Sequence, residues 1–201
     1  HGLGISFTFE AFKRIFRNGT HYSFNSILDF AVNSMPTFVI GRSLGEVLLG
    51  VFNRANMLVT LPTNNVSAAV SRVFFPLIAS LQTDRERLRE LYVKVSILIS
   101  LIMFPLSLGM VPAAPELIRV VLGEQWVSGV PVFQILAVGM MFHFASIYPG
   151  QYADAHGYLR VRTWIQVVTI LVMLAAIAAL LDYGIEGVSI GFAVAQIVRF
   201  V

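Results

Sequence analysis

Three polar side chains recur at helical spacing in an otherwise apolar segment near the start of the chain. Asn25, Asp29 and Asn33 stand at i, i+4 and i+8, so an α-helix stacks them on one face. An ionised carboxylate facing lipid costs at least about 2.5 kcal/mol, so this face should look into protein or water. Two interpretations stay open. Asp29 pairs with an arginine or lies near the cytoplasmic interface, or the face is a cavity wall or a site for a coupling cation.

A second polar row runs through residues 50–81, which could form one helix of about 48 Å. Arg54 and Arg72 lie five ideal turns apart and share a face with Asn65 if the kink at Pro62 is small. In one interpretation both arginines snorkel to opposite membrane interfaces and hold no substrate. In the other the row is a polar track, with guanidinium groups for phosphate and amides for hydroxyls. The candidate residues of this track are Arg54, Thr60, Asn64, Asn65 and Arg72.

The elements that must position these residues are apolar helices. Residues 95–115, 125–153 and 163–181 contain no Asp, Glu, Lys or Arg, and each is near or above the roughly 20 residues that cross about 30 Å of hydrocarbon. The composition, 57% hydrophobic and 12% charged, is unlike that of soluble domains, in which about a quarter of residues are charged. We therefore predict an all-α, polytopic transmembrane helix bundle of about six spans. After a cytoplasmic lead-in at 1–20, the spans are expected near 21–41, 50–81, 93–114, 127–153, 162–181 and, truncated, 187–201.

The basic residues between these spans predict the orientation, because Lys and Arg in short loops are retained on the cytoplasmic side. Nine basic residues fall on one predicted side and two on the other. The nine include Arg162, and we expect the end near Arg199 on the same side. The amino-terminal end is therefore predicted to be cytoplasmic. The nine residues are Lys13, Arg14, Arg17, Arg85, Arg87, Arg89, Lys94, Arg160 and Arg162, and the two opposite are Arg42 and Arg119.

Other features narrow the possible functions. The basic residues form no contiguous face with stacking aromatics, so we expect no nucleic-acid partner. The chain has no cysteine, no catalytic signature motif and no metal-binding motif, so we predict neither a catalytic residue, nor a metal site, nor a cofactor. His143 lies in an apolar run and is more typical of a packed or interhelical hydrogen-bonding residue than of a proton relay. Because the chain begins with His1 rather than Met, we expect it to be part of a longer protein.

Local signals predict two connections on the side opposite the amino-terminal end. Pro115 can start a short interfacial helix and Gly123 can end it. The tripeptide Asp182-Tyr183-Gly184 predicts a tight turn between the last two spans.

Several short motifs occur in order between residues 40 and 132. They are Gly50-Val51-Phe52-Asn53-Arg54-Ala55, Leu61-Pro62, Ser71-Arg72-Val73-Phe74-Phe75-Pro76, Leu81-Gln82, Phe104-Pro105, Ala114-Pro115-Glu116-Leu117 and Leu122-Gly123-Glu124-Gln125-Trp126. The set resembles the polysaccharide transporter family, the O-antigen and exopolysaccharide flippases of the multidrug, oligosaccharidyl-lipid and polysaccharide exporter superfamily. Members usually have two pseudo-symmetric helix bundles, and this chain resembles the carboxy-terminal one.

The resemblance implies a flippase of the bacterial inner (plasma) membrane. Its substrate would be a polyprenyl-pyrophosphate-linked oligosaccharide, moved to the periplasmic leaflet by alternating access. Membrane lipids and a missing amino-terminal helix bundle are the implied partners, and Arg54 and Arg72 are the implied pyrophosphate ligands. One departure concerns ion coupling: the family often has an Asp shortly before its Ile-Gly-Arg, where this chain has Pro36. The alternatives are a membrane-embedded glycan ligase or polymerase, and a drug or cation exporter of the same superfamily.

Overall fold

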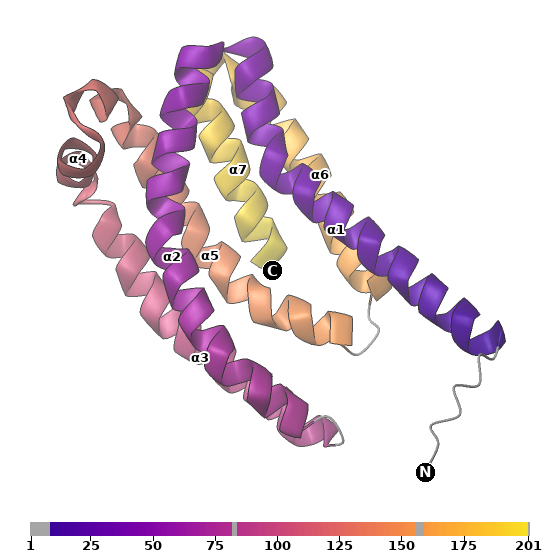
Figure 1. Cartoon of the computed structure of the whole chain (residues 1–201). Coiled ribbons are helices and arrows are strands. Elements are labelled where there is room, and N and C mark those ends of the chain that lie inside the picture. Colours follow the sequence, from indigo (N-terminus) through magenta and orange to yellow (C-terminus); the bar gives the residue numbers. More distant parts are fainter. Residues whose placement is uncertain (1–8, 82–83, 156–158, 201) are drawn as a thin grey trace.

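Helices make up the whole of the chain that the computed structural model describes, residues 9–81, 84–155 and 159–200, apart from short connections. The prediction of an all-α fold is thus confirmed. Residues 1–8 of the predicted lead-in lie outside the described ranges, and α1 begins within the remainder of the lead-in. The long helices (Figure 1) are α1 (Phe9–Ser43), α2 (Glu46–Ser80), α3 (Arg85–Met110), α5 (Val130–Ala155), α6 (Leu159–Leu180) and α7 (Gly184–Phe200).

The two predicted local connections are both present. The short helix α4 (Ala114–Leu117) continues into the π-helical turn η1 (Ile118–Leu122), and it ends at Gly123, whose φ of 100° suits glycine. A 3-10 turn, η2 (Glu124–Gly129), then leads into α5. The turn between α6 and α7 is η3 (Leu181–Tyr183), followed by Gly184 with a φ of 64°.

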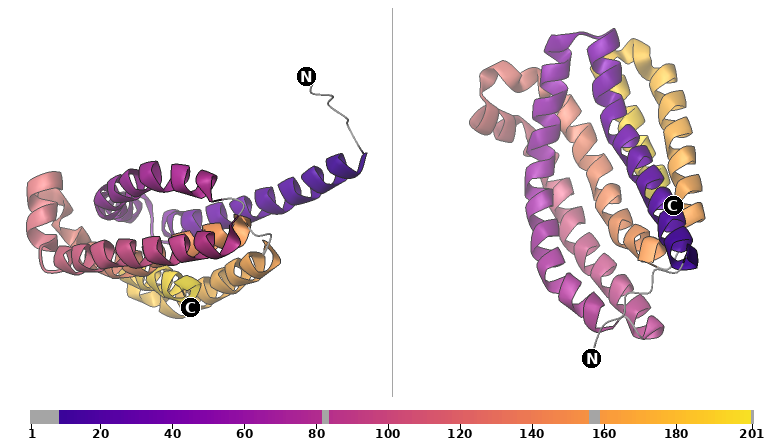
Figure 2. Two further views of the ribbon diagram at one scale, coloured as in Figure 1. Left: turned by 90° about the horizontal axis from the view of Figure 1, so that it is seen from below. Right: turned by 45° about the vertical axis from the view of Figure 1, so that its right-hand side comes forward.

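Helix α7 is the centre of the bundle. Its most extensive contacts are with α5 and α6, and α5 also packs along α3. Small residues permit these close approaches: a Cβ on Gly139 of α5 would lie 3.0 Å from Cα of Ala193, and one on Gly191 would lie 2.7 Å from Cγ1 of Ile177. Figure 2 shows α1 and α2 on one side of the molecule and α6 and α7 on the other. Helices α1 and α2 meet at their connecting turn and diverge from it (Figures 1 and 2).

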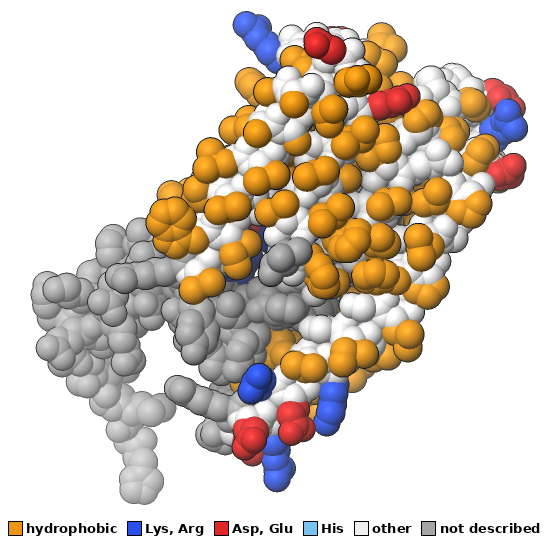
Figure 3. Space-filling view, turned by 180° about the vertical axis from the view of Figure 1, so that it is seen from behind, with side chains coloured by type: hydrophobic (Ala, Val, Ile, Leu, Met, Phe, Trp, Pro, Cys, Tyr) orange, Lys and Arg blue, Asp and Glu red, His pale blue; other side chains and the backbone are white. Residues whose placement is uncertain are grey.

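The surface pattern agrees with a membrane-spanning arrangement. On the face that Figure 3 shows, hydrophobic side chains cover the middle of the bundle and charged side chains gather near its two ends. Among the described residues, three helical stretches are long and apolar enough to cross a membrane, namely Glu86–Met110, Glu124–Ile147 and Val161–Phe200. The last of these contains both α6 and α7. Helices α1 and α2 are not among them because they carry the polar rows that the sequence singled out.

Candidate functional site

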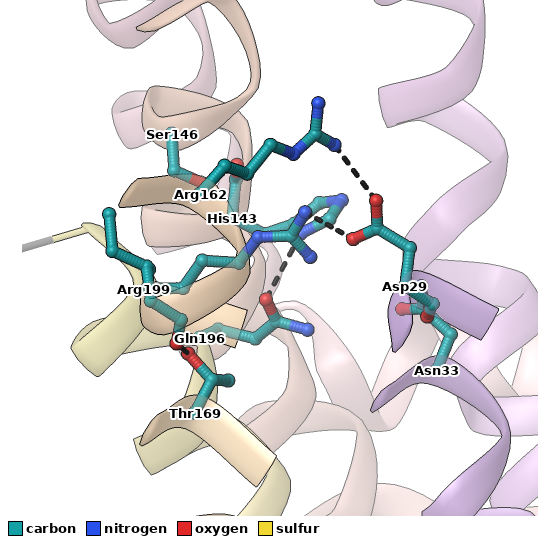
Figure 4. A network of polar contacts seen from close by, with 9 residues as sticks. Asp29, Asn33, His143, Ser146, Arg162, Thr169, Gln196 and Arg199 are labelled. Carbon is teal, nitrogen blue, oxygen red and sulfur yellow. Dashed lines mark hydrogen bonds and ion pairs between the residues drawn. The ribbon is translucent and has the colours of Figure 1, made fainter. Parts of the chain in front are cut away.

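The structure separates the predicted site residues into two regions. Those of α1 lie at or near contacts with the rest of the bundle, whereas most of those of α2 lie on its surface. The first region also draws in residues of α5, α6 and α7 that the sequence did not group together (Figure 4).

Asp29 is the centre of the first region. Its carboxylate accepts a hydrogen bond from Nη2 of Arg162 on α6 at 2.8 Å and another from Nη2 of Arg199 on α7 at 2.5 Å. The three side chains are 25%, 20% and 16% exposed, respectively. The structure thus favours the interpretation in which Asp29 pairs with arginine. We call Asp29, Arg162 and Arg199 the charged cluster.

Asn25 and Asn33 differ in their surroundings, although both share a helix with Asp29. Asn25 is only 2% exposed, and its Oδ1 accepts a hydrogen bond from the hydroxyl of Thr163 on α6 at 2.8 Å. Asn33 is exposed, and its amide donates to the backbone carbonyl of Asp29 at 2.8 Å. Only Asn25 therefore adds a second link from α1 to α6.

His143 extends the polar network to α5. Its Nδ1 lies 3.0 Å from Oε1 of Gln196 on α7, one helical turn from Arg199. The prediction of an interhelical hydrogen-bonding residue is confirmed. Figure 4 shows the side chains of α5, α6 and α7 converging on the side of α1 that carries Asp29. Four helices therefore share one polar region inside an apolar bundle.

Helices α1, α6 and α7 also contain buried amide atoms that have no hydrogen-bond partner among the described residues. They are Nδ2 of Asn25, Nε2 and Oε1 of Gln166, and Nε2 of Gln196. Each of the three side chains belongs to a residue at most 2% exposed. Buried polar groups are normally paired, so unpaired ones of this kind call for an explanation.

The second region is the polar row on α2. Arg54, Asn64, Asn65 and Arg72 are all exposed. The guanidinium carbon of Arg54 lies 5.7 Å from the centre of the Trp126 ring, a cation–π contact with η2.

Thr60 is half-buried within this row. Its hydroxyl donates to the carbonyl groups of Asn56 and Met57 in the preceding turn. Such bonds satisfy the hydroxyl inside its own helix, next to Pro62, which cannot donate a backbone bond. Thr60 is therefore satisfied within α2, whereas Arg54, Asn64, Asn65 and Arg72 are exposed.

Sequence reasoning missed the partners of Asp29. Arg162 was counted only among the basic residues that predict orientation, and Gln166 and Gln196 were not singled out. Helical spacing signals only that each pair shares a face, because Arg162 and Gln166 stand at i and i+4, and Gln196 and Arg199 at i and i+3.

A sequence model described as “Polysaccharide biosynthesis protein” matches residues 1–131, well over half of the chain. The chain belongs to this family. The resemblance to polysaccharide transporters that the short motifs indicated is thereby confirmed.

Three relatives of this polysaccharide biosynthesis family member are longer than the chain itself. The “Uncharacterized membrane protein in cps region” of Klebsiella pneumoniae is 27% identical over 180 residues, which cover 89% of this chain and 37% of that protein. The “Lipopolysaccharide biosynthesis protein WzxC” of Escherichia coli (strain K12) is 30% identical over 135 residues, 67% of this chain and 27% of that protein. The “Succinoglycan biosynthesis transport protein ExoT” of Rhizobium meliloti (strain 1021) is 29% identical over 114 residues, 57% of this chain and 23% of that protein.

The chain therefore spans well under half the length of these relatives. No solved structure matches it significantly. Within the part of the chain that the structure describes, no group of three His, Cys, Asp or Glu side chains could hold a metal ion. The chemistry that this family member offers in its two polar regions is guanidinium and amide hydrogen bonding, which suits phosphate and hydroxyl groups.

Proposed function

We propose that this chain is part of a flippase that transfers a polyprenyl-pyrophosphate-linked oligosaccharide from the cytoplasmic to the periplasmic leaflet of the bacterial inner membrane, for lipopolysaccharide or exopolysaccharide biosynthesis. Membership of the polysaccharide biosynthesis family and relatives named as lipopolysaccharide biosynthesis and succinoglycan transport proteins support the proposal.

The observation that carries the proposal is the exposed polar row of α2. Arginine facing hydrocarbon is costly, about 2.5–3.5 kcal/mol on insertion scales, and asparagine also loses its hydrogen bonds there. Arg54, Asn64, Asn65 and Arg72 are nevertheless exposed on the bundle. A surface of this kind suits a polar path that holds pyrophosphate and sugar hydroxyl groups.

Further helices of a longer transporter would form the opposite wall of this path. The relatives are about three to four times as long as the stretches that match them, which leaves room for a second bundle. Alternating access would then expose the path first to the cytoplasm, where the amino-terminal end of this chain lies, and then to the periplasm.

The connection between α3 and α5, which we place on the periplasmic side, supports transport over glycan processing. The connection between α3 and α5 is short, and its ion pair, Arg119 with Glu124 at 3.4 Å, is exposed. A ligase or polymerase would need a larger periplasmic portion with paired polar residues. The segment instead resembles a helical cap on the end of the bundle.

Deletion of the intact gene tests the assignment. We expect lipid-linked repeat units to accumulate on the cytoplasmic leaflet and surface glycan to be lost, measured by leaflet-specific labelling of the lipid-linked pool. Unchanged pools and normal surface glycan would reject the transport assignment.

Substitution in the α2 row tests the path itself. Arg54→Ala or Arg72→Ala should lower export by about tenfold or more while insertion persists, because each removes a charge-assisted bond to phosphate. The matched control is Arg87→Ala, an exposed arginine whose partner is Asp84 at 3.1 Å. Unimpaired export in both α2 variants would contradict the proposal that Arg54 and Arg72 bind pyrophosphate.

A further inference from the structure

We propose that Trp126, together with the amides of Asn53 and Gln125, forms a sugar-binding subsite at one end of the exposed polar row of α2. Its ligand is a pyranose ring of the lipid-linked oligosaccharide, so the inference rests on the proposed function. The subsite lies where η2 packs on the first turns of α2, at the end of the bundle that holds the α1–α2 turn (Figures 1 and 2). We place this end toward the periplasm.

The Trp126 ring is fixed on α2 by close contacts. A Cβ on Gly50 would lie 3.8 Å from Cη2 and Cζ3 of the ring, and one on Gly129 would lie 3.1 Å from Cγ1 of Val51. The backbone N–H of Trp126 donates to the carbonyl of Gly123 at 3.1 Å. The ring is therefore held in place before a ligand arrives, and a preorganised group loses little entropy on binding.

The same ring borders the exposed face of α2. Its indole is half-buried, and the guanidinium carbon of the exposed Arg54 lies 5.7 Å from its centre. An aromatic ring offers a flat apolar surface whose face is negatively polarised. Such a surface suits the C–H groups on one side of a pyranose ring.

Two amides next to the ring can bind the sugar hydroxyl groups. Asn53 lies one helical turn after Gly50 on the same side of α2, and Gln125 precedes Trp126 in η2. Both are exposed, and neither side chain forms a hydrogen bond with another described residue. An amide both donates and accepts, as a hydroxyl group does, whereas an ionised phosphate only accepts. The pair of amides therefore favours a sugar over a phosphate as the ligand of this subsite.

The other tryptophan of the chain has different surroundings. Trp164 on α6 is 71% exposed, and the exposed residues at helical spacing from it, Val161, Val168 and Leu171, are apolar. These surroundings are typical of a tryptophan that faces lipid. Trp126 instead has two amides and a guanidinium group beside it, which lipid tails cannot satisfy.

The test uses the intact transporter in phosphatidylcholine nanodiscs. The probe is the repeat-unit oligosaccharide, released by mild acid from the lipid-linked pool of the bacterium and titrated calorimetrically. Wild type should bind it, and Trp126→Ala should weaken binding by about tenfold or more through loss of the stacking surface. Trp126→Tyr keeps an aromatic ring and should stay within about threefold of wild type. Asn53→Ala should weaken binding by about threefold or more through loss of a hydrogen bond. The matched control, Trp164→Ala, should leave the affinity unchanged.

Wild-type affinity in Trp126→Ala would overturn the subsite, and Trp126 would then only anchor η2 at the membrane interface. Absence of oligosaccharide binding by wild type would overturn it as well. Because Trp126 also packs against the core, Asn53→Ala decides the question if Trp126→Ala does not fold: wild-type affinity in Asn53→Ala would overturn the subsite. The gene-deletion assay reports on transport separately, so a failed sugar subsite and a failed flippase assignment give different results.

Discussion

The polar residues of α1 and those of α2 arise from similar sequence patterns but lie in opposite surroundings. Asp29 and Asn25 are joined to α6 and α7 by interhelical bonds. Arg54 and Arg72 lie on the surface, where the guanidinium group of Arg54 stacks over the ring of Trp126. Polar groups within the bundle therefore serve two purposes. Groups that the bundle itself pairs fix its helices, and groups that it leaves exposed are available to other helices or to a substrate.

The largest effect should follow from Asp29→Ala, which leaves two mostly buried arginines without their shared carboxylate. We expect the free energy of unfolding to fall by about 3 kcal/mol, the usual loss when one partner of a buried ion pair is removed. The measurement is chemical denaturation of the intact transporter in detergent micelles. An exposed ion pair provides the control: Glu90→Ala removes the partner of Lys94 and should cost less than about 1 kcal/mol. Equal losses of unfolding free energy in the two variants would contradict the distinction between the mostly buried charged cluster and an exposed ion pair.

A smaller effect should separate two asparagines. Asn25→Ala removes the acceptor of the Thr163 hydroxyl, so the free energy of unfolding should fall by about 1 kcal/mol. Asn65→Ala, on the exposed face of α2, should change it by less than about 0.5 kcal/mol. The same denaturation series measures both. If Asn65→Ala proved the more destabilising, α2 would be a packed helix and not a free face.

The helix positions followed from the sequence because they depend on local chemistry. Long uncharged stretches, a proline that starts a helix and glycines at positive φ each act over a few residues. The single face assigned to Asn25, Asp29 and Asn33 was less accurate. Each step of four residues overshoots a full turn by about 40°, so two steps rotate a side chain by about 80°. Asn25 is consequently buried and Asn33 exposed.

The partners of Asp29 could not be predicted from one helix. Arg162 and Arg199 lie 133 and 170 positions away in sequence, and charge counting assigned both to the cytoplasmic end. In the structure both guanidinium groups instead bind the carboxylate of Asp29 on α1. Which arginine meets which carboxylate depends on how α6 and α7 pack. Small residues such as Gly191 decide that packing through contacts distant in sequence.

Thiol labelling tests the central contrast between α1 and α2 most directly. The chain contains no cysteine, so a single introduced thiol would be the only one within it. Asn65→Cys and Asn25→Cys in the intact transporter would each be treated with a hydrophilic maleimide in membranes. We expect Asn65→Cys to react, and Asn25→Cys to react only after denaturation. Rapid labelling of Asn25→Cys with a protected Asn65→Cys would contradict it.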